Sequence, residues 1–111
     1  IVKPGIAYEE LQIGARRGLT AELIDMGFLK GTVEQNLESG AYMKYYPHNI
    51  GHFLGMDVHD VGLYKVNGNS RMLAEGMVIT VEPGLYIPEN DDTVPKEYRG
   101  IGIRIEDDVL V

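Results

Sequence analysis

The sequence predicts an α+β domain in which helices cover one face of a mainly antiparallel sheet. Two helix-type patterns precede Pro47, Gly-punctuated β-prone runs follow it, and the chain contains no internal repeat. With 111 residues, 44% of them hydrophobic, we expect residues 1–111 to form one domain with one hydrophobic core.

The first helix is predicted over residues 7–26. From Tyr8 to Ile24, apolar residues recur mostly at spacings of three and four, which is the period of one helix face. Gly27 follows as a C-cap, and we expect Phe28 and Leu29 to fold back onto the core.

A second, weaker helical pattern runs over residues 32–46. Thr32 is suited to be its N-cap, and Gln35 stands at the position that completes a capping box. Pro47 ends this pattern because proline cannot continue a helix.

Beyond Pro47 the pattern predicts strands and turns. The expected strands are Gly51–Val58, Met77–Val81 and Ile101–Val111, with a turn at Asn67-Gly68 inside the polar loop Val61–Arg71 and an acidic loop at Pro88–Arg99.

Composition excludes several functional classes. The net charge of -7 argues against a nucleic-acid partner, and no apolar run approaches the roughly 20 residues that cross a bilayer. The absence of cysteine excludes disulfides, a thiolate nucleophile and a zinc ribbon. The sequence on these grounds predicts a cytoplasmic protein without nucleic-acid or membrane partners.

All three histidines lie within twelve residues, at His48, His52 and His59. The first two have the i, i+4 spacing of a helical zinc motif, but that motif requires Glu where this chain has Asn49. The glycines that flank His52 favour instead a strand or turn that brings one imidazole into a site. The alternative is that these histidines are structural.

Glu82 stands at the end of the most hydrophobic run of the chain, directly before Pro83-Gly84. An ionised carboxylate there is costly unless a metal ion or a buried arginine pairs with it. The alternative is a Glu at the end of a strand that reaches solvent.

Alternation along the last strand places Ile101, Ile103 and Ile105 on one face, which we expect to be core, and Gly102, Arg104 and Glu106 on the other. The polar face is either an ion-pair ladder or the wall of an active site. It is not a dinucleotide fingerprint, since Ile105 replaces the third glycine. One histidine with Glu82 and Glu106 forms an oxygen-rich ligand set of the type that suits Mn(II).

Three blocks of sequence resemble the pita-bread metallopeptidase family, and within it the X-Pro aminopeptidases (aminopeptidase P). They are residues 48–60 (HNIGHFLGMDVHD), 76–86 (GMVITVEPGLY) and 98–108 (YRGIGIRIEDD), in the family's order. The resemblance covers essentially the whole chain. It implies the C-terminal part of a pita-bread fold, with helices packed on a curved, mainly antiparallel sheet.

The resemblance also implies a chemistry: two metal ions, usually Mn(II) with Co or Zn as alternatives, activate a bridging hydroxide that attacks the peptide bond before a proline in second position. Carried over by position, His52, Glu82 and Glu106 resemble metal ligands, and Glu82 also handles the proton of the water. His48, His59 and Arg104 resemble residues that bind the substrate and stabilise the developing oxyanion.

The family's site has five protein ligands, and its two aspartates come from a preceding segment that has no counterpart in this sequence. We therefore expect the chain to be the C-terminal half of a catalytic domain, inactive by itself, from an enzyme that is a homo-oligomer when intact. Two alternatives are a prolidase, which cleaves X-Pro dipeptides, and a non-catalytic pita-bread domain that binds peptides or proteins.

Overall fold

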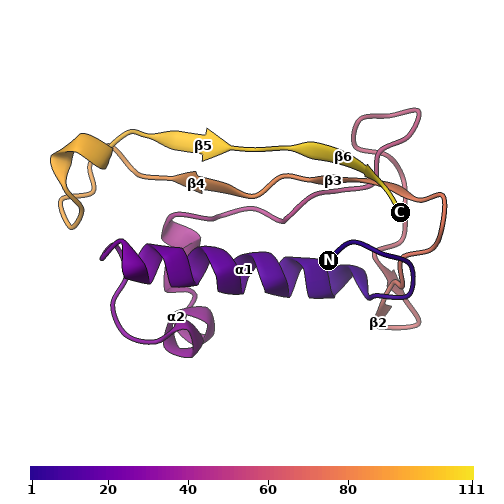
Figure 1. Cartoon of the computed structure of the whole chain (residues 1–111), viewed down its shortest axis with the longest axis horizontal. Coiled ribbons are helices and arrows are strands. Elements are labelled where there is room, and N and C mark those ends of the chain that lie inside the picture. The colour runs from indigo at the N-terminus through magenta and orange to yellow at the C-terminus, as the bar shows by residue number, and fades with distance from the viewer. The chain divides into compact units, whose positions relative to one another are not determined.

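The structure is a computed structural model that describes all 111 residues (Figure 1). It consists of two compact units whose segments alternate along the chain. The first contains residues 1–14, 49–83 and 105–111, and the second contains residues 15–48 and 84–104. Neither helix of the chain has the length and apolar character required to cross a membrane.

Helix α1 spans Tyr8–Asp25 and contributes residues to both units (Figure 1). The expected helix over residues 7–26 is confirmed. Gly27 has a φ of 77°, a left-handed conformation that glycine adopts without steric cost and that ends the helix. Phe28 and Leu29 both donate backbone hydrogen bonds to Leu23, and both are buried as predicted.

Helix α2 is shorter than predicted and spans only Val33–Ser39. The capping box is confirmed, since the Thr32 hydroxyl accepts from the Gln35 amide and the Gln35 side chain accepts from the Thr32 amide. Gly40, with a φ of 74°, ends the helix, and a separate 3₁₀ turn follows at Ala41–Lys44. The predicted extension to residue 46 is therefore wrong, because a left-handed glycine interrupts it.

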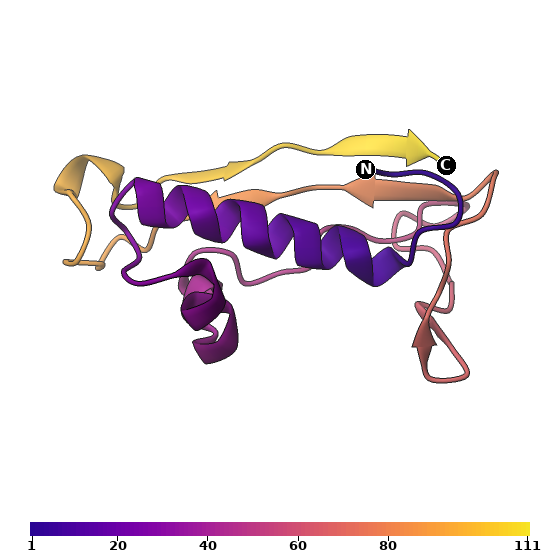
Figure 2. The ribbon, with the colours of Figure 1, turned by 60° about the horizontal axis from the view of Figure 1, so that its bottom comes forward.

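The first unit is built on an antiparallel pair of strands, β3 (Val78–Val81) and β6 (Asp107–Leu110). Their arrows point in opposite directions in Figure 2, and their register runs from Val78 opposite Leu110 to Val81 opposite Asp107. The predicted strand Met77–Val81 is thus confirmed at Val78–Val81, and its Ile79 is completely buried.

The segment before β3 is less regular than the sequence predicted. In place of a strand at Gly51–Val58 the structure has one isolated bridge between Phe53 and Ile79. The Asn67-Gly68 turn is confirmed, and it joins two short strands, β1 (Lys65–Val66) and β2 (Asn69–Ser70), that the sequence did not predict.

In the second unit, β4 (Gly84–Tyr86) pairs antiparallel with β5 (Gly102–Arg104). The loop between them, predicted at Pro88–Arg99, contains a 3₁₀ turn at Lys96–Tyr98. The core of this unit is rich in aromatic residues, and its buried members are Leu23, Phe28, Leu29, Tyr42, Tyr45, Tyr46, Ile87 and Val94.

One burial prediction is wrong. Ile101, Ile103 and Ile105 were expected in the core, but their side chains are 42%, 59% and 68% exposed. Alternation along a strand only separates its two faces. Which face is buried depends on the elements that cover it. Here Ile101 and Ile103 line an open apolar pocket together with Met26 and Phe28, so they are covered only in part.

Candidate metal centre

The end of β3 positions a buried carboxylate. Glu82 is 8% exposed, and its amide donates a 2.7 Å hydrogen bond to the carbonyl of Ile50. Its Oε1 accepts a 2.9 Å hydrogen bond from the hydroxyl of Thr80, which lies two residues earlier on the same face of the strand. Backbone pairing and a side-chain donor together fix the position of this carboxylate.

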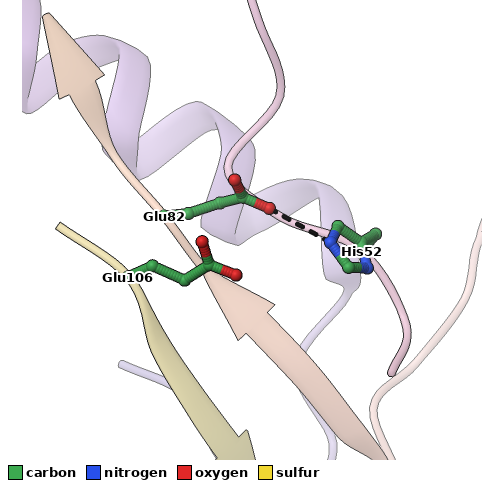
Figure 3. A group of neighbouring side chains, drawn as sticks. All are labelled: His52, Glu82 and Glu106. Carbon is green, nitrogen blue, oxygen red and sulfur yellow. Dashed lines mark ion pairs between the residues drawn. The ribbon is translucent and has the colours of Figure 1, made fainter. Parts of the chain in front are cut away.

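The segment that pairs with β3 positions His52. Its Nδ1 lies 2.9 Å from the carbonyl oxygen of Phe53, which can only accept a hydrogen bond. Nδ1 therefore carries a hydrogen, and in the neutral ring Nε2 presents a lone pair. Nε2 lies 3.3 Å from Oε1 of Glu82 (Figure 3). A proton or a cation between these two atoms is needed for them to attract each other.

Glu106 completes the cluster. It precedes β6, is exposed, and directs its carboxylate toward that of Glu82 (Figure 3). One ligand atom from each of His52, Glu82 and Glu106 lies within 4.8 Å of the other two. Because like charges at this separation repel, two carboxylates beside one imidazole nitrogen favour a cation among them.

The donor set fits a divalent metal ion. A metal-binding histidine normally donates its other ring N–H to a carbonyl or carboxylate, as His52 does to Phe53. One imidazole nitrogen with carboxylate oxygens suits manganese, cobalt or zinc. His52, Glu82 and Glu106 are thus the residues of this chain that would hold such an ion, in agreement with the ligand set that the resemblance implied.

The remaining predicted site residues lie in two places. His59 belongs to the first unit, and its ring centroid is 4.3 Å from that of His52. His48 and Arg104 belong to the second unit, where both contact Tyr86. The centroid of the His48 ring is 5.5 Å from that of Tyr86, and Nε of Arg104 donates a 2.6 Å hydrogen bond to the Tyr86 hydroxyl.

Sequence reasoning missed Tyr86 and Thr80. Tyr86 pairs with Gly102, and a Cβ on that glycine would come within 3.0 Å of the Tyr86 ring. Gly102, two residues before Arg104, thus makes room for the ring of Tyr86, whose hydroxyl accepts the hydrogen bond from Arg104. For Thr80, the available signal was a hydroxyl residue two positions before Glu82 in an otherwise apolar strand.

Comparison with known proteins assigns the chain to a family. The model of metallopeptidase family M24 matches residues 1–111. The chain belongs to this family. Among curated M24 relatives, the Xaa-Pro aminopeptidase of Haemophilus influenzae is 48% identical over 111 residues, and human Xaa-Pro aminopeptidase 3 is 45% identical over 108 residues. These alignments cover 100% and 97% of the chain but 25% and 20% of the relatives.

Solved structures agree with the M24 assignment. The structure of Pseudomonas aeruginosa aminopeptidase PepP matches 99% of the chain at 49% identity with a TM-score of 0.96, over 25% of its own length. Zinc-substituted Escherichia coli aminopeptidase P in complex with product matches with a TM-score of 0.88 at 43% identity, over 100% of this chain and 25% of its own. The predicted fold class, α+β and part of a pita-bread fold, is confirmed, and the chain spans about a quarter of these M24 relatives.

Proposed function

We propose that this chain is the C-terminal part of an X-Pro aminopeptidase, and that it contributes His52, Glu82 and Glu106 to a dinuclear metal centre. The single observation that carries the proposal is the convergence of these three ligand atoms within 4.8 Å. The curated relatives support the reaction class, since they are named as Xaa-Pro aminopeptidases.

The proposed reaction divides its tasks among the residues of the chain. Two divalent cations, with manganese preferred, would supply an acidified water as nucleophile and polarise the scissile carbonyl. Glu82 accepts the proton of the attacking water and returns it to the leaving proline nitrogen, which is general base and then general acid catalysis. His59, beside His52, donates a hydrogen bond to the developing oxyanion. Peptide binding by His48 and Arg104 stays a prediction from the resemblance.

The ligands of this chain are too few for two ions. A dinuclear site requires bridging carboxylates and more acidic ligands than Glu82 and Glu106 provide. The remaining ligands are proposed to come from residues outside these 111, which accords with the quarter of the M24 relatives that the chain covers. Assembly of the intact enzyme as a homo-oligomer likewise stays a prediction.

The test uses the full-length protein that contains this chain, supplied with manganese, and three peptides. We expect hydrolysis of a longer peptide with proline in second position, and no hydrolysis when alanine replaces that proline. Cleavage confined to an X-Pro dipeptide would indicate a prolidase. Metal-independent peptide binding without hydrolysis would indicate a binding domain. The 111-residue chain alone, as control, should be inactive.

A further inference from the structure

Thr80 connects two proposed ligands of the cluster, the buried Glu82 and the partly buried His52, through one atom. Its Oγ1 accepts a 2.9 Å hydrogen bond from the backbone amide of His52 and donates a 2.9 Å hydrogen bond to Oε1 of Glu82. That Oε1 is also the atom 3.3 Å from Nε2 of His52. The three residues therefore form a ring of contacts, in which the Thr80 hydroxyl bonds to both of the other residues.

The hydroxyl occupies a place that a backbone carbonyl fills in a regular sheet. In an antiparallel pair, opposite residues exchange two N–H···O=C bonds. Here the Thr80 amide donates to the His52 carbonyl at 2.8 Å, but the return bond from the His52 amide goes to Thr80 Oγ1. The Thr80 side chain thus replaces one backbone hydrogen bond between the two segments. Unlike a backbone carbonyl, this hydroxyl can be removed by mutation.

The local packing makes this arrangement specific. Gly51 approaches β3 so closely that a Cβ on it would collide with the Thr80 carbonyl oxygen. The Thr80 side chain is 2% exposed, so solvent water cannot replace its hydroxyl easily. Because Oγ1 already accepts the His52 amide hydrogen, its own hydrogen is directed at the Glu82 carboxylate.

We propose that Thr80 is a positioning residue for the metal centre. Its hydroxyl holds the backbone of His52 and the carboxylate of Glu82 in register, so that both ligands are oriented before an ion binds. This inference rests on the proposed function, since it assigns a role toward the same metal centre. Residues that orient metal ligands typically change metal affinity about 10–100-fold when they are removed.

The test measures manganese affinity of the full-length protein by isothermal titration, together with peptide hydrolysis at limiting and saturating manganese. Thr80→Val keeps the shape but removes the hydroxyl, and we expect a manganese Kd about tenfold higher or more. Its kcat/KM should fall most at limiting manganese and recover in part at saturation. Thr80→Ser keeps the hydroxyl and should stay within about threefold of the wild type.

Thr20 offers a matched control. Its side chain is completely buried in α1 and its hydroxyl has no hydrogen-bond partner, so Thr20→Val removes a buried threonine hydroxyl that belongs to the second unit, whereas the cluster belongs to the first. This variant should bind manganese as the wild type does. If Thr80→Val does not fold, Thr80→Cys, a weak donor and acceptor, carries the same expectation.

Wild-type affinity in Thr80→Val would overturn the inference, and so would equal losses in Thr80→Val and Thr80→Ser. A wild-type protein that binds no manganese and cleaves no peptide would instead contradict the proposed function. The two failures are therefore distinguishable.

Discussion

The two units each bury a carboxylate, and the groups that surround it differ. In the second unit, the side chain of Asp91 is only 1% exposed. Its carboxylate accepts hydrogen bonds from Nζ of Lys44 and from the Tyr45 hydroxyl, both at 2.7 Å. It also accepts hydrogen bonds from the amide and the hydroxyl of Thr93, at 3.0 and 2.6 Å. In the first unit, the buried Glu82 lies beside an imidazole nitrogen and a second carboxylate.

The difference separates a structural carboxylate from one that we propose binds a metal ion. Asp91 has a cation of the protein itself, the ammonium group of Lys44, and its bonds attach the loop after β4 to the core residue Tyr45. Near Glu82 lie a nitrogen of His52 and a carboxylate oxygen of Glu106, atoms that could hold a metal ion, and we propose that together they attract a cation from outside. Burial of an acidic side chain alone does not identify a metal site; the chemistry of its neighbours does.

The largest expected effect comes from Glu82→Gln in the full-length protein. This change keeps the shape of the side chain but removes its negative charge and its capacity to accept a proton. We expect kcat/KM to fall by more than about 100-fold, since loss of a residue that only orients a ligand already costs 10–100-fold. The measurement is peptide hydrolysis at saturating manganese. Activity within tenfold of the wild type would show that Glu82 is not part of the centre.

Added manganese should stabilise the protein through the cluster that contains Glu82, and not through Asp91. At 100 times its Kd, the ion should raise the free energy of unfolding by about 2.7 kcal/mol, because it binds the folded state. Thermal unfolding with and without manganese measures the effect. We expect Tyr45→Phe to retain this gain and Glu82→Gln to lose it. A gain that both variants lose would remove the distinction between the two units.

Tyr45→Phe should lower stability without lowering metal affinity. Tyr45 is completely buried, and its hydroxyl donates to the charged Asp91. Loss of a hydrogen bond to a charged group costs about 1.5–3 kcal/mol. Urea unfolding measures the cost, and Tyr42→Phe, which leaves Asp91 untouched, is the control. Equal stability of Tyr45→Phe and the wild type would show that this bond contributes nothing.

The pH dependence of the unfolding free energy should reflect the ionisation of the Asp91 carboxyl group. The hydrogen bond from Lys44, followed by those from Thr93, holds the pKa of the Asp91 carboxyl well below its usual range. A group whose pKa is depressed by folding stabilises the protein above its unfolded pKa, about 3.9 for Asp. This contribution is lost as the pH falls through the folded value.

Unfolding experiments on the wild type and Asp91→Asn check this expectation. The difference in unfolding free energy between them should be constant from about pH 5 to 8 and shrink below about pH 4. A difference that grows on acidification would contradict the assigned cause of the shift.

The sequence predicted the features that depend on local chemistry. The period of α1, the Thr32 capping box and the Asn67-Gly68 turn each follow from residues close together in the chain, and all three are confirmed. The convergence of His52, Glu82 and Glu106 could be predicted because the motifs that carry them are short and distinctive, whereas metal binding by them stays a prediction.

The features that the sequence did not predict depend on contacts between residues far apart in the chain. The burial of Ile101 and Ile103 is set by whatever covers their strand, which alternation does not encode. The role of Thr80 depends on a segment 28 residues earlier in the chain, which meets β3 only in the folded structure. The wrong end of α2 has a different origin, because Gly40 could have been recognised as a stop signal.

The most direct test of the account is a crystal structure of the manganese-soaked full-length protein with anomalous data collected near the manganese edge. We predict an anomalous peak within bonding distance of Nε2 of His52 and of carboxylate oxygens of Glu82 and Glu106. A peak bound elsewhere, or none at these three residues in crystals that remain active, would contradict it.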